Sequence, residues 1–284
     1  MVTPFTADGG LDLAGAERLA AHLVDSGNDC VVVNGTTGES PTTSDAEKEQ
    51  LLRTVVAAVD GRATVVAGVG TNDTAHTVEL ARTAERVGAH GLLVVTPYYS
   101  RPPQEALYRH FTTVADATGL ECMVYDIPAR TGTEVTSETL LRLAEHPRIT
   151  AVKDAKDDVA ASSAVLARTD LAYYSGTDAL NLPLLAVGAT GFVSVVGHLV
   201  GAELRQLLDS FTNGDPVKAR ELNQRLVPVY EGIFRAPGVV LVKAALRLLG
   251  LPGGPVRAPL IDADAAQIER LVRDLRAGGL PGLA

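Results

Sequence analysis

Tryptophan is absent from this 284-residue chain, and aromatic residues make up only 4% of it, although hydrophobic residues make up 46%. A large core without tryptophan has to be built from Val, Leu, Ile and Ala. That composition is typical of a parallel sheet buried on both faces. The length exceeds that of most single domains but lies within the range of one large α/β domain.

Cysteine is scarce as well. Cys30 and Cys122 each open an apolar run, so we expect both to be small core residues, and two cysteines are too few for a disulfide framework. The six histidines are scattered, and no His, Cys and Asp cluster has metal-ligand spacing. A phosphate loop of the G-x-x-x-x-G-K type is also missing. We therefore expect neither a metal nor a bound cofactor.

Basic runs and long apolar runs are missing too. The net charge is −9 and the isoelectric point is about 5.2, which disfavours nucleic-acid and anionic-membrane partners. No segment approaches 18 unbroken apolar residues, and the start MVTPFTADGG lacks the charged and apolar regions of a signal peptide. We expect a cytoplasmic protein without a nucleic-acid or membrane partner.

Eight short apolar runs, rich in strand-forming residues, recur along the chain. They begin at Met1, Cys30, Ala63, Gly91, Glu121, Ile149, Leu171 and Gly191. Helical patterns lie between them, over 12–26, 44–59, 74–87, 103–117, 136–145 and 159–167. This alternation predicts a closed (β/α)8 (TIM) barrel. The rival fold, a doubly wound open sheet, needs a phosphate-binding glycine turn after an early strand, and none is present.

Strand patterns stop after Gly201. Four helical segments follow, over 202–213, 216–234, 238–249 and 263–277, separated by Gly and Pro signals. Some of these helices cover the barrel, and the remaining ones predict a helical region appended to it. We expect a barrel at 1–215 and a C-terminal helical extension at 216–284.

The stretch ITAVKDAK places Lys153 at the end of a buried strand. A buried ammonium is costly unless it is paired or deprotonated. On the strand alone two interpretations stay open. In the first, Lys153 is structural, and it extends to solvent or pairs with Asp154 or Asp157. In the second, Lys153 is a reactive amine.

Polar residues follow the other strands at the end where barrel enzymes carry their sites. They are 34–40, 71–72, 96–99, 125–130 and 175–178. Each has a simpler role: GTTGES as a capping turn, Tyr98 and Tyr99 as interface aromatics, Arg130 as a solvated side chain. Together they suit amine catalysis, in which a lysine of lowered pKa forms a Schiff base with a ketone. Phenols and hydroxyls would move protons, and GTTG amides would hold a carboxylate.

These motifs resemble a known family. GTTGES, TPYYSRPPQEALYRHF, YDIPARTG, VKDA and GFVSV stand in the order and approximate spacing of dihydrodipicolinate synthases. These enzymes belong to a superfamily of pyruvate-dependent lyases that includes N-acetylneuraminate lyase and 2-keto-3-deoxygluconate aldolase. The resemblance spans nearly the whole chain. It implies condensation of pyruvate with aspartate 4-semialdehyde in lysine and diaminopimelate synthesis, through a Schiff base and without a cofactor.

The resemblance also implies a role for each matching residue. Lys153 would form the Schiff base with pyruvate, and Tyr125 would donate and accept the proton beside it. Thr36 and Tyr99 would complete the proton relay, with Tyr99 reaching into the site of a neighbouring subunit. A homodimer is then the minimum, and the family implies a homotetramer of two tight dimers.

Four more residues would bind substrate by the same resemblance. Thr37 would hold the pyruvate carboxylate, and the backbone at Gly176 and Val193 would line the pocket. Arg130 would bind the carboxylate of the semialdehyde, since a guanidinium fork suits a carboxylate. Two alternatives remain: an aldolase or dehydratase for 2-keto-3-deoxy sugar acids, and a catalytically silent barrel that binds a keto acid.

Departures from the family pattern concern feedback by lysine. Family members inhibited by lysine carry histidines after GTTGES and a glutamate after the third-loop asparagine. Here those places hold Asp45, Lys48 and His76, although Asn72 and Tyr98 remain. We predict weak or absent lysine inhibition.

Overall fold

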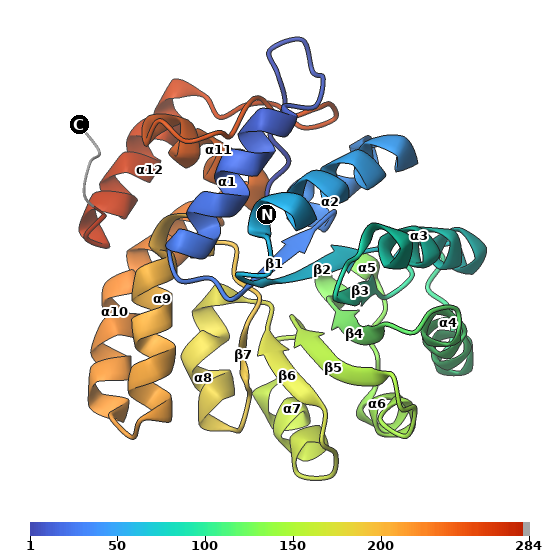
Figure 1. Ribbon diagram of the computed structural model, residues 1–284. Helices are drawn as coiled ribbons and strands as arrows, with labels where there is room; N and C mark the ends of the chain where they lie inside the picture. Colours follow the sequence, from blue (N-terminus) through green and yellow to red (C-terminus); the bar gives the residue numbers. More distant parts are fainter. Residues whose placement is uncertain (281–284) are drawn as a thin grey trace. The chain divides into compact units, whose positions relative to one another are not determined.

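The computed structural model describes residues 1–280, which divide into two compact units (Figure 1). The first unit joins Met1–Thr64 to the segment from Ser194 onward, and the second is Val65–Val193. Strands and helices alternate in chain order as far as α9, and helices alone follow. The predicted boundary between a barrel at 1–215 and an extension at 216–284 stays a prediction.

Parallel strands form the sheet of the second unit, each paired with the next along the chain. They are β2 (Thr64–Gly68), β3 (Gly91–Val95), β4 (Glu121–Asp126), β5 (Ile149–Asp154), β6 (Ala172–Ser175) and β7 (Gly191–Phe192). Because parallel neighbours need a crossover, a helical segment returns the chain after each strand. These segments are α3 (Thr74–Val87), α4 (Gln104–Asp116), α5 (Pro128–Thr131), α6 (Ser137–Leu143), α7 (Val159–Leu166), η3 (Asp178–Leu180) and α8 (Asn181–Ala186). The carboxyl ends of the strands therefore share one edge.

Capping residues set both ends of α3. The Asp73 side chain accepts a hydrogen bond from the Ala75 amide before α3, and Gly88 ends α3 at φ 94°. The bounds of α3 are those predicted. The short helices α5 and α8 were not predicted, because four or six residues are too few to show a helical period.

The first unit contains one strand and most of the long helices. Its elements are α1 (Leu13–Asp25), β1 (Cys30–Val33), η1 (Thr36–Gly38), η2 (Ser40–Thr42), α2 (Asp45–Val59), α9 (Gly197–Thr212), α10 (Pro216–Ile233), α11 (Gly238–Leu248) and α12 (Ala265–Ala277). A capping box begins α2, since Ser44 and Glu47 bond each other's backbone amides. Residues 238–246 of α11 are all buried, so α11 is the core helix of this unit.

The prediction of a strand at Met1 is wrong for the described residues. Only Phe5 makes a bridge, to Leu11. Pro4 has no amide hydrogen to donate, and the Val2 amide donates to His198 Nε2 at 2.9 Å rather than to a neighbouring strand. The segment is nevertheless buried, with Val2 and Thr3 both 0% exposed. Residues 1–280 therefore contain seven named strands rather than eight.

Cys122 is buried as predicted, but Cys30 is exposed. Burial alternates along β1, with Val31 and Val33 buried. Since side chains alternate with period two, Cys30 projects from the opposite side, and its core position was wrongly predicted.

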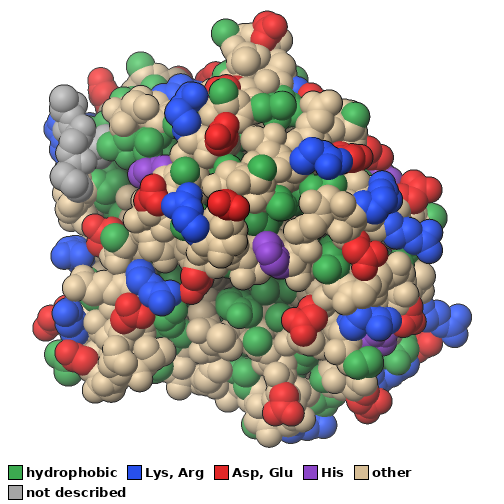
Figure 2. Space-filling view, in the orientation of Figure 1, with side chains coloured by type: hydrophobic (Ala, Val, Ile, Leu, Met, Phe, Trp, Pro, Cys, Tyr) green, Lys and Arg blue, Asp and Glu red, His purple; other side chains and the backbone are tan. Residues whose placement is uncertain are grey.

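No helix within residues 1–280 has both the length and the apolar character to cross a bilayer. On the face drawn in Figure 2, Lys and Arg side chains lie scattered among Asp and Glu. The described residues on that face form no extended basic patch of the kind that binds phosphate backbones.

Candidate active site

Lys153 lies near the carboxyl end of β5, in register with Tyr125 of β4 and Tyr174 of β6. Neighbours in register project from the same face of a sheet. The Lys153 side chain is buried, and its Nζ lies 4.1 Å from the centroid of the Tyr125 ring. The structure thus brings together the two residues on which the predicted chemistry depends.

Burial lowers the pKa of Lys153 to about 8, with Arg130 adding to the shift and the carboxylate of Asp178 opposing it. At pH 7 roughly one amine in ten is then neutral, against about one in three thousand for an ordinary lysine. Because only the neutral amine attacks a carbonyl, the site supplies a nucleophile at physiological pH.

The alternative partners of Lys153 are engaged elsewhere. Asp154 Oδ2 accepts from Ser162 Oγ at 2.6 Å, and Asp157 Oδ1 accepts from Thr177 Oγ1 at 2.8 Å. Neither acid forms an ion pair with Lys153 in the described part of the chain. The interpretation of Lys153 as a paired structural lysine is therefore not supported.

Gly176 lies against the lysine side chain. A Cβ added to Gly176 would stand 3.1 Å from Lys153 Cε and 3.1 Å from the Asp154 carbonyl oxygen, tighter than most real contacts. Val193 follows β7, and its amide donates to the Ser175 carbonyl at 2.8 Å. The absence of a side chain at Gly176 leaves room for the amine to reach a substrate.

Tyr125 is buried beside the amine. Burial raises the pKa of its phenol to about 12, while the positive charge of Arg130 opposes that shift. The phenol is therefore protonated at neutral pH. Thr96 fixes the end of β4, because its amide and its Oγ1 both donate to the Tyr125 carbonyl at 3.0 Å. This anchoring sets the position from which the phenol projects.

Arg130 and Tyr99 follow β4 and β3, respectively, at the same edge. Arg130 lies in α5, is exposed, and is near enough to influence the pKa values of both Lys153 and Tyr125. Tyr99 is 91% exposed and adopts a left-handed φ of 72°, which is unfavourable for a residue with a Cβ. Its amide donates to the Thr131 carbonyl at 3.3 Å. Because its side chain is so exposed, the Tyr99 phenol lies apart from the buried pair of Lys153 and Tyr125.

Thr36 and Thr37 belong to the first unit, in the 3-10 helix η1. Thr36 is exposed and Thr37 is half-buried. Their approach to Lys153, which lies in the second unit, stays a prediction. The GTTGES turn that carries them also contains Glu39, whose φ is 56°.

Glu39 anchors that turn through buried charges. Its Oε1 lies 2.5 Å from Lys243 Nζ, and the two side chains are 1% and 0% exposed. Glu39 Oε2 accepts from the Arg257 amide at 2.8 Å, and Lys243 Nζ also donates to the Pro255 carbonyl at 2.7 Å. Glu39 thereby ties the turn to α11 and to the segment before α12.

Replacing Lys243 with methionine is expected to lower the free energy of unfolding by about 3–5 kcal/mol, because Glu39 would keep a buried charge without its partner. Urea unfolding at pH 7 measures this. The double variant E39Q/K243M is expected to recover most of the loss, and exposed Lys218→Met provides the control. Equal unfolding midpoints for K243M and K218M would contradict this role of the pair.

Asp126 and Asp178 lie within the predicted polar segments 125–130 and 175–178, but neither of them was assigned a role from the sequence. Asp178 is a buried carboxylate that raises the pKa of Lys153, and Asp126 forms a buried ion pair with Lys156. The only available signal was an acidic residue after a strand, in SGTD and YDIP, which is equally typical of a turn. Within residues 1–280 no three His, Cys, Asp or Glu side chains lie together as a metal site requires.

Comparison with known proteins gives close relatives along the whole chain. The Dihydrodipicolinate synthetase family profile matches residues 1–278. The 4-hydroxy-tetrahydrodipicolinate synthase 2 of Streptomyces coelicolor is 64% identical over 280 residues, covering 99% of this chain and 94% of the relative. The 4-hydroxy-tetrahydrodipicolinate synthase of Acidothermus cellulolyticus is 64% identical over 284 residues, covering 100% of this chain and 92% of the relative.

Solved structures agree with the sequence comparison. The crystal structure of DHDPS from Cyanidioschyzon merolae with lysine bound has a TM-score of 0.97 at 41% identity, covering 99% of this chain and 96% of that one. The likeness confirms the predicted α/β fold as a TIM-barrel-like fold with C-terminal helices. The chain therefore belongs to the dihydrodipicolinate synthetase family.

Proposed function

We propose that this protein is a 4-hydroxy-tetrahydrodipicolinate synthase, a lyase that condenses pyruvate with L-aspartate 4-semialdehyde in lysine and diaminopimelate biosynthesis. The observation that carries the proposal is the buried Lys153 amine, whose pKa lies near 8, next to Tyr125. Relatives that are 64% identical bear this name. A Schiff base needs this combination of a neutral amine and a nearby proton donor.

The chemistry begins at Lys153. Its Nζ attacks C2 of pyruvate, and the carbonyl oxygen leaves as water after proton transfer, which forms an iminium. The iminium accepts electrons when the methyl group loses a proton, so no separate cofactor is required. The resulting enamine carbon attacks the aldehyde carbon of the semialdehyde, and the aldehyde oxygen takes up a proton. The iminium that re-forms then loses Lys153 Nζ to an incoming water or to the amino group of the bound semialdehyde, which releases the product. Tyr125, Thr36 and Tyr99 would relay these protons.

Substrate binding is assigned to the remaining residues. Thr37 would hold the pyruvate carboxylate, and the backbone at Gly176 and Val193 would line the pocket. Arg130 would bind the semialdehyde carboxylate through both arms of its guanidinium. The neutral polyol chain of a 2-keto-3-deoxy sugar acid would offer the Arg130 guanidinium no matching charge. Arg130 therefore favours the semialdehyde as the second substrate.

The proposed assembly is a homotetramer made of two dimers, active in the cytoplasm. The support is Tyr99, which is 91% exposed although the proposed relay needs its phenol at a reaction centre. A neighbouring subunit is the obvious place for that centre. Active monomers in sedimentation velocity would contradict the assembly.

The test of the function is a pair of assays on the purified protein. With pyruvate and aspartate 4-semialdehyde, coupled to the next reductive step, we expect turnover. With 2-keto-3-deoxy sugar acids, followed by pyruvate release, we expect none. Activity confined to the sugar acids would replace the proposed function, and binding of pyruvate without turnover would identify a silent barrel.

The pH dependence of Schiff-base formation is a separate prediction. Because the pKa of Lys153 is lowered to about 8, borohydride trapping of pyruvate should rise with pH below 8 and level off above it. Below pH 8 the amine is mostly protonated and cannot attack, and above it the amine is mostly neutral. Mass spectrometry of the intact protein after short trapping pulses measures the rate. A rise that continues to pH 10 would show an ordinary lysine.

Lysine is expected to inhibit weakly or not at all. Lys48 lies in α2, and its ammonium donates to the Thr43 carbonyl, so it adds positive charge where a cationic effector would approach. His76, in α3, stands where lysine-inhibited members carry a glutamate. Initial rates at increasing L-lysine test this prediction. Half-inhibition at submillimolar lysine would show that it is wrong.

A further inference from the structure

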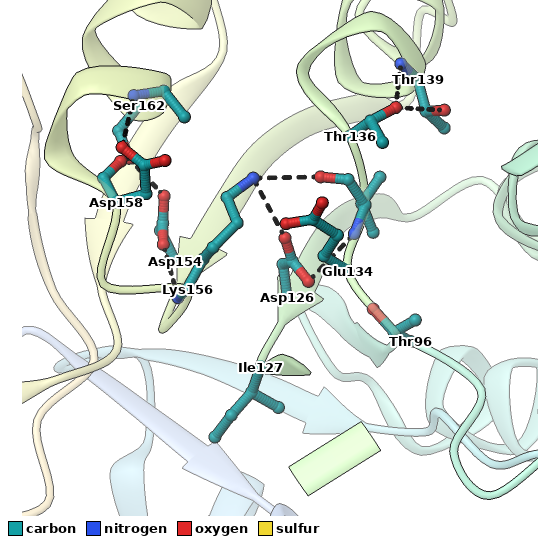
Figure 3. Close-up of polar contacts among 12 residues, drawn as sticks. Thr96, Asp126, Ile127, Glu134, Thr136, Thr139, Asp154, Lys156, Asp158 and Ser162 are labelled. Atoms are coloured by element: carbon teal, nitrogen blue, oxygen red, sulfur yellow. Dashed lines mark hydrogen bonds and ion pairs between the residues drawn. The ribbon is translucent and has the colours of Figure 1, made fainter. Parts of the chain in front are cut away.

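Asp126 and Lys156 form a buried ion pair (Figure 3). Asp126 directly follows Tyr125 in the sequence, and Lys156 lies three residues after Lys153. Lys156 Nζ lies 3.4 Å from Asp126 Oδ2, and the side chains are 7% and 1% exposed. Asp126 follows Tyr125 on β4, so the alternation of side chains turns it to the other face of the sheet. Burial raises the pKa of Asp126 to about 6, against the opposing effect of Lys156, so its carboxylate is ionised at pH 7. The proposed reaction uses neither residue, and burying both charges is costly, so stability alone is a poor reason for the pair.

The pair binds both polar groups of Val135. The Val135 amide donates to Asp126 Oδ1 at 3.1 Å, and Lys156 Nζ donates to the Val135 carbonyl at 3.0 Å. Val135 is 0% exposed. The chain leaves β4 at Asp126 and returns beside it at Val135, so these two hydrogen bonds close the loop 127–134.

The pair is itself held in place from β5. The Lys156 amide donates to Asp154 Oδ1 at 2.9 Å, and Asp154 Oδ2 accepts from Ser162 Oγ at 2.6 Å. Asp126 and Asp154 are register partners in the parallel sheet. In Figure 3 the Lys156 side chain extends from the loop after β5 to the Asp126 carboxylate. The loops that follow Tyr125 and Lys153 are therefore fastened to each other.

The closed loop carries Arg130 and also supports Tyr99. Thr131, the neighbour of Arg130, accepts the Tyr99 amide at its carbonyl, 3.3 Å away. Arg101 Nε donates to the Gly132 carbonyl of the same loop at 2.6 Å. A shift of this loop would move the guanidinium and the exposed phenol together.

We propose that Asp126 and Lys156 are positioning residues, which fasten the 127–134 loop so that Arg130 meets the carboxylate of the second substrate. This role rests on the function proposed above. Displacing a binding group by about 1 Å, even from a distant position, can cost as much as 10²-fold in rate. Loss of the pair should therefore weaken use of the semialdehyde and spare the reaction of Lys153 with pyruvate.

The experiment compares K156M, D126N/K156M and the exposed control K218M in the full-length protein. The double variant removes both charges, so it avoids the unpaired buried carboxylate that could prevent K156M from folding. In the double variant we expect the KM for semialdehyde to rise about tenfold or more, with the KM for pyruvate and borohydride trapping within about twofold of wild type. K218M should match wild type in all of these.

Amide hydrogen exchange gives a readout that does not depend on the second substrate. Peptides that cover 127–135 should exchange about tenfold faster or more in D126N/K156M than in K218M, with peptides from β5 unchanged. Unchanged exchange in this loop, or equal increases in the two KM values, would overturn the positioning role. If the wild type traps pyruvate but does not turn over semialdehyde, the proposed function fails. The exchange measurement still tests the pair in that case, because unchanged exchange in the loop would reject its fastening by Asp126 and Lys156.

Discussion

Replacing Lys153 with methionine is expected to reduce turnover of pyruvate and aspartate 4-semialdehyde by about 10⁴-fold or more, because the covalent route is lost with its amine. Methionine has a similar length and fills the same buried space, so the site should keep its packing. In the wild type, burial disfavours the charged form of Lys153 and lowers its pKa to about 8. The substitution removes this disfavoured buried cation. We therefore expect an inactive variant that is at least as stable as wild type. The coupled rate and thermal unfolding measure the two effects.

The adduct with pyruvate is the sharper readout for the same variant. After borohydride treatment, wild type and K218M should each gain the mass of one reduced pyruvate adduct, and K153M should gain none. Lys156 lies three residues away, but its ammonium is held by Asp126 and the Val135 carbonyl, so it should not substitute. An adduct of equal yield in K153M would remove Lys153 from its proposed role.

Residues that lie close in sequence and repeat a pattern made most of the fold predictable. The helix from 74 to 87 has an acid before it and a glycine after it, and both act as caps in the structure. The end of β5 was predictable for a similar reason, since an apolar run that stops at Lys153 marks the edge where barrel sites lie. Local pattern thus located the amine, and the resemblance supplied its proposed role.

Contacts between distant segments were not predictable from pattern. Nothing in YDIP or DAKDD shows that Lys156 reaches Asp126, or that both bind Val135, because the match arises only when β4 and β5 pair in register. Gly176 was expected as a pocket residue, but its closeness to Lys153 Cε is a property of packing. At the chain start the apolar run predicted a strand, whereas a hydrogen bond from Val2 to His198, 196 residues away, replaces that pairing.

Replacing Arg130 with methionine is expected to lower kcat/KM for aspartate 4-semialdehyde by about 10²-fold, since the substrate carboxylate would lose a charged hydrogen-bonding partner as it enters the site. Arg130→Lys keeps the charge but loses the planar fork, so a smaller loss is expected. The exposed Arg220→Met on α10 is the matched control and should behave as wild type. Steady-state kinetics with each substrate varied separately measures the effect. A comparable loss in kcat/KM for pyruvate would argue against carboxylate recognition by Arg130.

A second effect of the same substitution follows from charge. Arg130 lowers the pKa of Lys153, so removing it should raise that pKa and move the borohydride trapping curve to higher pH. Arg130→Lys should leave the curve near its wild-type position, because the positive charge remains. The two variants therefore separate the two roles of the guanidinium. Charge near the amine governs the pH of Schiff-base formation, whereas the fork governs the choice of the second substrate. If R130M and R130K shift the trapping curve equally, Arg130 acts on Lys153 through packing rather than through its charge.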